Sequence, residues 1–162
     1  MISTSTAPTT WGETFPSSGL PHVRYLLDTN VLTEPAKPRP DPNVVTWLQA
    51  QSPLDLAVSV LTFGEVQKGV SLLAAGARRD ALESWLRTDL PRQFMERLLP
   101  VDGSVALEWG RLTAEGRKTG RELPVIDGLL LATCAVHGLT LVTRNERDCG
   151  HRGIPILNPW VG

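Results

Sequence analysis

Short runs of apolar residues recur along the chain. Most of them are bounded by proline, aspartate or turn residues. Runs of this length predict β-strands, which we expect at residues 23–27, 56–60, 98–101, 139–143 and 154–157. Several of the runs contain few polar residues, which is typical of a parallel sheet covered on both faces. Pro155 lies inside the last run and lacks a backbone donor, so we expect that strand at an edge of the sheet.

Between these runs, apolar residues recur at the three-to-four-residue spacing of an amphipathic helix. This spacing predicts helices at residues 44–48, 62–73, 78–87, 105–116 and 125–137. Gly138 directly follows the last of them and is a typical C-terminal stop. Four prolines between residues 35 and 42 predict a stiff loop in which no helix persists. The alternation of strands and helices predicts one α/β domain with a central parallel sheet.

Length and composition suit a single globular domain. The chain has 162 residues, of which 41% are hydrophobic and 20% charged, enough to bury a core. No apolar run approaches the roughly 20 residues needed to span a bilayer, and the N-terminus lacks the pattern of a secretory signal. Residues 1–21 are rich in Ser, Thr and Pro and show neither apolar period. We therefore expect a flexible N-terminal tail followed by a domain at 22–162.

The cysteines and the net charge bear on zinc binding, on the cellular compartment and on the binding of nucleic acid. The two cysteines, Cys134 and Cys149, form no CxxC pair and have no histidine at zinc-ligand spacing. Few cysteines and no signal sequence predict a cytoplasmic protein. The formal net charge of -1 gives no overall basic bias. Binding of nucleic acid would therefore depend on a local basic patch.

Acidic residues lie where predicted strands give way to helices or loops. Asp28 follows the first strand, Glu65 and Asp127 lie in the first turns of two predicted helices, and Asn145 and Asp148 follow the strand at 139–143. The carboxyl ends of parallel strands meet at one edge of a sheet, so these side chains are expected to gather there. Carboxylate oxygens are the ligands that Mg²⁺ and Mn²⁺ prefer. A cation held in this way can activate water and neutralise charge at a scissile phosphate.

Each acid also has a purely structural explanation. Asp28 could cap a helix, and Thr62 with Glu65 matches the Thr-x-x-Glu capping box. Asp127 would be favourable near any helix N-terminus, and Asp148 could be a solvated loop residue. The recurrence of acids at equivalent strand-to-helix junctions favours a shared metal site over three separate caps.

At these residues the sequence resembles the PIN-domain ribonucleases, and within them the VapC toxin family, in its FitB-like subgroup. Three segments resemble those that carry the family's acids: LLDTNVL at 26–32, LTFGEVQKG at 61–69 and LPVIDGLL at 123–130. LVTRN at 141–145 and LNPW at 157–160 resemble its closing strands. Each motif is short, but the ordered set is specific and spans about residues 25–160.

The resemblance implies a PIN-like α/β/α sandwich and a Mg²⁺- or Mn²⁺-dependent endoribonuclease, the toxin of a type II toxin–antitoxin system. It also implies a homodimer, inhibition by a VapB-like antitoxin, and a larger assembly that binds operator DNA through the antitoxin. Asp28 and Asp127 carry over as metal ligands, and Glu65 as an acid acting directly or through water. The family often has a fourth acid, for which Asn145 occupies the nearest matching position and Asp148 lies close by.

Further polar residues are candidates for supporting roles. Thr29 and Asn30 would orient Asp28 or bind a metal-bound water, with local capping as the alternative, and Thr143 and Asn145 lie near the site. Several basic residues could meet RNA phosphates, although a solvated surface explains most of them: Lys68, Arg117, Lys118, Arg121, Arg144 and Arg147. Arg144, beside the acids, and Lys68 are the RNA-binding candidates. The apolar faces of helices 62–73 and 78–87 predict contact with an antitoxin or a second subunit.

Two other functions compete with the nuclease. A phosphatase of the haloacid-dehalogenase type also begins with a strand followed by aspartate, but it needs a second aspartate where this chain has Asn30. A non-catalytic module that binds nucleic acid or protein on a PIN-like fold is the stronger alternative. The presence of all three main acids argues against it, and metal binding that depends on Asp127 would separate the two.

Overall fold

The computed structural model describes residues 22–162, and its strands form one parallel sheet. The strands are β1 (Tyr25–Leu27), β2 (Leu56–Ser59), β3 (Leu98–Leu99), β4 (Thr140–Val142) and β5 (Ile156–Leu157). Their order is β3-β2-β1-β4-β5, and every neighbouring pair is parallel. The predicted central parallel sheet is confirmed, and β5, the strand next to Pro155, lies at an edge as expected.

The direction of strand order reverses beside β1. The chain runs outward from β1 through β2 to β3 and then returns to the other side of β1 for β4 and β5. Leu27 lies opposite Val142, so β1 and β4 end at the same level. In open parallel sheets, ligands bind outside the carboxyl ends of the strands at such a reversal. The residues that follow β1 and β4 are therefore side by side at the position where a site is expected.

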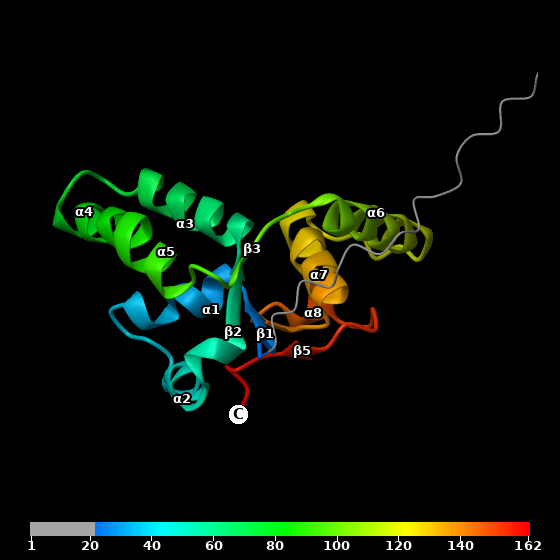
Figure 1. Ribbon diagram of the computed structural model, residues 1–162, viewed down its shortest axis with the longest axis horizontal. Helices are drawn as coiled ribbons and strands as arrows, with labels where there is room; N and C mark the ends of the chain where they lie inside the picture. Colours follow the sequence, from blue (N-terminus) through cyan, green and yellow to red (C-terminus); the bar gives the residue numbers. More distant parts are fainter. Residues whose placement is uncertain (1–21) are drawn as a thin grey trace, which may run out of the picture.

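Helices cover both faces of the sheet (Figure 1). They are α1 (Thr29–Thr33), α2 (Pro42–Ala50), α3 (Val60–Leu72), α4 (Ala77–Ser84), α5 (Leu90–Gln93), α6 (Gly103–Lys118), α7 (Val125–His137) and α8 (Glu146–Cys149). A π-helical turn, Trp85–Asp89, joins α4 to α5 without a break. In Figure 1, α1, α3, α4 and α5 lie on one side of the strands, and α6 and α7 lie on the other.

Alternation along the strands gives the sheet two separate cores. Leu26 and Leu141 face α6 and α7, together with buried residues such as Leu112 and Leu130. Leu27 and Val142, the next residue in each strand, belong to the core on the α3 side. Successive side chains of a strand point to opposite faces, so both faces of β1 and β4 are buried. This explains why the strands contain so few polar residues.

The predicted proline loop is wrong in part. Pro42 is the first residue of α2, and Asp41 caps this helix by accepting a hydrogen bond from the Asn43 amide, 2.9 Å. Pro35 lies in a 3₁₀ turn, Glu34–Ala36. Proline is compatible with the first turn of a helix because the amide that it lacks has no partner there in any case. The helix predicted at 44–48 is therefore longer than expected.

Other boundaries also differ from the sequence prediction. The helix predicted to begin at residue 62 begins at Val60, and the one predicted at 78–87 continues through the π-helical turn to Gln93. The short helices α1 and α8 were not among the predicted helices. The predicted flexible tail at 1–21 lies outside the described residues. Among residues 22–162, no helix has both the length and the apolar character needed to cross a membrane.

Candidate metal-dependent active site

Asp28 lies at the junction of β1 and α1 and uses its two carboxylate oxygens differently. Oδ1 accepts a hydrogen bond from the Thr29 amide, 2.7 Å, and so caps α1. Oδ2 accepts from the Thr143 hydroxyl, 2.6 Å, and from the Asn30 side-chain amide, 3.1 Å. The side chain is only 9% exposed. Helix capping therefore explains the position of Oδ1. Oδ2 instead contacts Thr143, directly after β4, and Asn30 on α1.

Glu65 does not form the capping box that its sequence pattern suggested. The helix begins two residues before Thr62, and Ser59 is the N-cap, accepting a hydrogen bond from the Leu61 amide, 3.2 Å. Glu65 consequently lies in the second turn of α3. Its Oε2 accepts a hydrogen bond from the Thr29 hydroxyl, 2.5 Å. The contact joins Glu65 to the residue after Asp28, 36 positions earlier in the chain.

Asp127 lies in the first turn of α7, as predicted, and is partly buried. Its Oδ2 accepts a hydrogen bond from the Asn145 side-chain amide, 3.1 Å. Burial raises the pKa of Asp127, and the negative charges of Asp28, Asp148 and Glu65 raise it further, against the lowering effect of Asn145. The other three acids proposed from the sequence therefore all act electrostatically on Asp127.

The fourth position is shared between Asn145 and Asp148. Asn145 precedes α8 but makes no side-chain cap, because its amide is turned toward Asp127. Its backbone amide donates to the Thr143 hydroxyl, 3.0 Å. Asp148, on α8, is exposed and reaches Asp127 through charge. The Asn145 amide thus contacts Asp127, whereas the Asp148 carboxylate lies at the margin of the acids.

The acids do not form a ready-made ligand cage. Within residues 22–162, no group of three or more His, Cys, Asp and Glu side chains is arranged to hold a metal ion directly. Each carboxylate instead has a neutral partner: Thr143 and Asn30 for Asp28, Thr29 for Glu65, and Asn145 for Asp127.

The donor set nevertheless suits a hard divalent cation. Its groups are carboxylates, hydroxyls and amides, which offer oxygen ligands, as Mg²⁺ and Mn²⁺ require. Asn30 Oδ1 is buried and has no hydrogen-bond donor among the residues that the structure describes. This oxygen lies on the residue whose amide contacts Asp28. An unpartnered acceptor beside a group of mutually repelling carboxylates fits a site that takes up a cation.

The two RNA-binding candidates are both exposed. The guanidinium carbon of Arg144 lies 5.5 Å from the centroid of the Trp160 ring, a cation–π distance. Arg144 makes no hydrogen bond or ion pair with another described residue through its side chain. Lys68 lies on α3, three residues after Glu65, and its side chain likewise has no described ionic partner.

Glu34, which the sequence analysis did not single out, is a buried acid near Arg144. It is 3% exposed; one oxygen accepts from the Asp41 amide, 2.9 Å, and the other pairs with Lys37, 2.5 Å. Burial opposes its ionisation, but these hydrogen bonds and the charges of Lys37 and Arg144 hold its pKa below the usual range. Its contacts fix the chain between α1 and α2. The only sequence signal was an acid next to the proline cluster.

Comparisons with known proteins agree with the fold of the chain. The PIN domain family matches residues 25–151. Toxin FitB of Neisseria gonorrhoeae is 34% identical over 135 residues, which cover 83% of this chain and 97% of that protein. VapC ribonuclease Y4jK of Sinorhizobium fredii is 32% identical over 135 residues, covering 83% and 96%. The crystal structure of FitAcB from Neisseria gonorrhoeae gives a TM-score of 0.81 at 34% identity, with 85% of this chain and 99% of that chain covered.

Proposed function

The chain belongs to the PIN domain family, and from this membership we propose that it is a metal-dependent endoribonuclease, the toxin of a type II toxin–antitoxin pair. Two relatives carry these functions in their names, toxin FitB and VapC ribonuclease Y4jK. The observation that carries the proposal is the placement of Asp28, Glu65 and Asp127 at one edge of the sheet, where they accept hydrogen bonds from Thr143, Thr29 and Asn145. Such a cluster is unfavourable in ionised form without a cation, and a cation is what phosphodiester hydrolysis uses.

Mg²⁺ or Mn²⁺ is the proposed cofactor. Asp28 and Asp127 would hold it, with Glu65 acting directly or through water and Asp148 at the margin. When bound, the cation supplies activation of a water molecule and neutralisation of charge at the scissile phosphate. Hydrolysis forms a bond from the water oxygen to phosphorus and breaks the bond to the leaving ribose oxygen.

The neutral neighbours of the acids have a positioning role in this proposal. Thr143 and Asn30 fix the orientation of Asp28 Oδ2, Thr29 fixes Glu65, and Asn145 fixes Asp127. Groups that orient metal ligands through hydrogen bonds commonly change metal affinity or activity 10–100-fold when removed, by order of magnitude. Arg144 and Lys68 would contact RNA phosphates beside the acids.

Partners follow from the same relatives. The similar solved structures include FitAcB and FitAB bound to an IR36 DNA fragment. We propose that this chain also forms a homodimer, is inhibited by a VapB-like antitoxin, and binds operator DNA through that antitoxin. Leu72, 78% exposed at the end of α3, is part of the apolar surface proposed for these contacts. Cys134 and Cys149 are free and buried, which suits the cytoplasm, the proposed compartment.

The test is cleavage of structured RNAs by the purified, antitoxin-free chain in Mg²⁺ or Mn²⁺. We expect cleavage that EDTA abolishes and that Asp127→Asn reduces to background. Asp80→Asn, an exposed aspartate on α4, is the matched control and should cleave like the unaltered chain. Cleavage that persists unchanged in Asp127→Asn would contradict the proposal, because it would not come from this site.

The second candidate function, a non-catalytic binding module, is favoured by one observation. The described acids form no preassembled metal cage. The module predicts that RNA binding, or antitoxin binding, is retained while the chain neither binds Mg²⁺ nor cleaves any RNA. Calorimetric titration of Mg²⁺ into the unaltered chain and into Asp127→Asn distinguishes the two functions.

A further inference from the structure

Three of the basic residues that the sequence offered for phosphate contact, Lys118, Arg121 and Arg147, gather with Arg152 around two pockets. The pockets share Arg121, Gly150, His151 and Arg152. The first, about 540 Å³, also includes Lys118 at the end of α6, and the second, about 350 Å³, includes Arg147 on α8. We call these two spaces the basic pockets. Residues separated by up to 34 positions (118 to 152) thus contribute positive charge to one surface.

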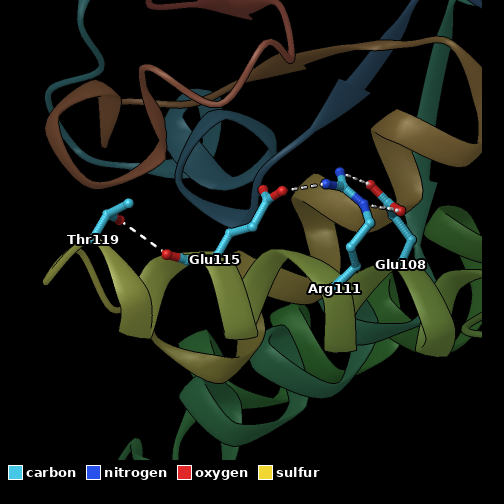
Figure 2. A network of polar contacts seen from close by, with 4 residues as sticks. All are labelled: Glu108, Arg111, Glu115 and Thr119. Atoms are coloured by element: carbon cyan, nitrogen blue, oxygen red, sulfur yellow. Dashed lines mark hydrogen bonds and ion pairs between the residues drawn. The ribbon is translucent and has the colours of Figure 1, made fainter.

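Two of the three acids that line the basic pockets, Glu115 and Glu122, form ion pairs with arginines outside the pockets, whereas Asp148 forms none among residues 22–162. Glu115 pairs with Arg111 at 2.8 Å, in the network along α6 that also includes Glu108 and the Thr119 hydroxyl bonded to the Glu115 carbonyl (Figure 2). Glu122 pairs with Arg117 at 3.5 Å. Lys118, Arg121 and Arg147 form no ion pair with any residue in 22–162. Their charge therefore remains available to a ligand.

The shape of the basic pockets depends on specific backbone features. The Arg152 guanidinium donates to the Arg121 carbonyl, 2.5 Å, and ties two loops together. A Cβ on Gly116 would lie 2.7 Å from the same carbonyl, so only glycine allows the loop to approach α6 this closely. His151 has φ 66, the only positive φ of a non-glycine residue in the described chain. Such backbone strain is retained where surrounding contacts enforce it.

One buried donor in the basic pockets lacks an acceptor. Arg152 Nε is buried and has no hydrogen-bond partner among residues 22–162. A buried guanidinium donor without an acceptor is costly, and an oxygen of a bound ligand would satisfy it. Guanidinium groups match the geometry of phosphate and carboxylate oxygens through paired hydrogen bonds.

The basic pockets adjoin the acid cluster, by which we mean Asp28, Glu65, Asp127 and Asp148. Asp148 lines the second pocket, and its charge also acts on Asp127. A polyanionic strand whose scissile phosphate lies at the acids would therefore have neighbouring phosphates within reach of Arg147 and Arg121. The chain has a formal net charge of -1, so a local patch must supply the attraction for such a strand.

We propose that the basic pockets bind backbone phosphates of the RNA strand. These are the phosphates next to the scissile phosphate, which lies at the acid cluster of the same strand's binding site. The inference rests on the proposed function, because it assumes that RNA is the substrate. It assigns Arg121, Arg147 and Lys118 to phosphate binding, and Arg152 to both loop attachment and phosphate binding. These contacts raise affinity without reading the base sequence.

The test compares two double variants for binding to a fluorescein-labelled single-stranded RNA. Arg121→Ala with Arg147→Ala removes two charges from the basic pockets and leaves the Arg121 carbonyl in place. Arg78→Ala with Arg92→Ala removes two exposed charges from α4 and α5, which lie across the strands from α6 (Figure 1). Both pairs are made in the Asp127→Asn background in EDTA, so that no cleavage occurs.

We expect the pocket variant to weaken binding about tenfold and to reduce the slope of log affinity against log salt by about 1.4, at about 0.7 per phosphate contact on a single strand. The α4–α5 variant should keep the affinity and the slope of the parent. Equal losses in both variants would overturn the proposal, because general charge would then explain binding. No loss in the pocket variant would overturn it as well.

Two further measurements separate the possible failures. If the unaltered chain cleaves RNA in a metal-dependent way and the pocket variant does so with unchanged KM, the proposed function stands and this inference falls. If the unaltered chain neither binds nor cleaves RNA, both fall. Saturable binding of inorganic phosphate, lost in the pocket variant while RNA affinity is unchanged, would show a free-phosphate site and also overturn the inference.

Discussion

Thr143, at the end of β4, donates a 2.6 Å hydrogen bond to Asp28, at the end of β1, across 115 positions of sequence. Both residues are buried, and the bond spans the place where the strand order reverses. It connects the two strand ends that the acid cluster depends on. Every other contact among the site residues extends from this pair through Thr29, Asn30 or Asn145.

Thr143→Val should remove the side-chain hydrogen bond between these strand ends. The valine fills nearly the same space but leaves Asp28 Oδ2 without its hydroxyl donor and the Asn145 amide without its acceptor. We expect a loss of about 1–3 kcal/mol in the free energy of unfolding, measured by urea titration. RNA cleavage should fall about 10–100-fold. Thr143→Ser keeps the hydroxyl, and if it lost as much activity as Thr143→Val, the hydrogen bond would not be the cause.

Asn145→Asp tests the fourth position of the acid cluster. The change replaces the amide that donates to Asp127 with a second carboxylate, 3.1 Å away in the present structure. In EDTA the free energy of unfolding should fall by about 1–2 kcal/mol through lost hydrogen bonding and added repulsion. Saturating Mg²⁺ should restore it, because a ligand that binds only the folded chain stabilises it. Asn145→Ala is the control; a Mg²⁺ response as large in this variant would contradict the explanation.

The raised pKa of Asp127 predicts a dependence of stability on pH. The folded chain holds the proton of Asp127 more tightly than the unfolded chain does. The stability from this protonation is therefore complete below the ordinary aspartate pKa of about 3.9 and is lost as the pH rises through the higher folded value. In metal-free buffer, Asp127→Asn should be more stable than the parent at neutral pH, and the difference should disappear in acid. Unfolding curves from acid to neutral pH, with Asp80→Asn as control, measure this; a gain that grew toward acid would have the wrong sign.

Gly128 and Gly110 give opposite predictions within one pair of helices. A Cβ on Gly128 would lie 3.0 Å from Cδ1 and 3.1 Å from Nε1 of Trp109, where α7 packs against α6. Gly128→Ala should lower the free energy of unfolding by about 1–3 kcal/mol through overpacking. Gly110, on α6, has open space at the same position, so Gly110→Ala should raise it by up to about 1 kcal/mol. Thermal unfolding of both variants is the measurement, and a neutral Gly128→Ala would refute the close approach.

The start of α3 can be tested through its two hydroxyl residues. Ser59 caps the helix, whereas the buried Thr62 Oγ1 has no partner among the described residues. Ser59→Ala should cost about 1 kcal/mol of the free energy of unfolding, as for other N-caps. Thr62→Val should be neutral or stabilising, because it removes a buried unpaired hydroxyl. Urea titrations measure both changes. A larger loss in the free energy of unfolding for Thr62→Val than for Ser59→Ala would show that Thr62, as in a capping box, is the N-cap.

Sequence reasoning predicted the parallel sheet, α7 with its end at Gly138, and the three acids that the structure brings together. These depend on local patterns: apolar runs, a glycine stop and acids directly after strands. It could not assign Glu65 to its partner, because the Thr29 contact joins segments 36 positions apart. It also missed Glu34, whose burial results from the folding back of residues 37–41. It named Lys118, Arg121 and Arg147 but not their grouping with Arg152 around the basic pockets, which arises from loop packing around Gly116.

The alternation of Leu26 and Leu27 between the two cores makes β1 intolerant of changes in chain length. Deleting one residue before Asp28 would exchange the two leucines between the faces of the sheet and shift Asp28 away from Thr143. Insertions and deletions among homologues of this sequence should therefore be absent from the positions of residues 25–29. They should accumulate instead in the exposed turn around Gly76, between α3 and α4, which contributes to neither core.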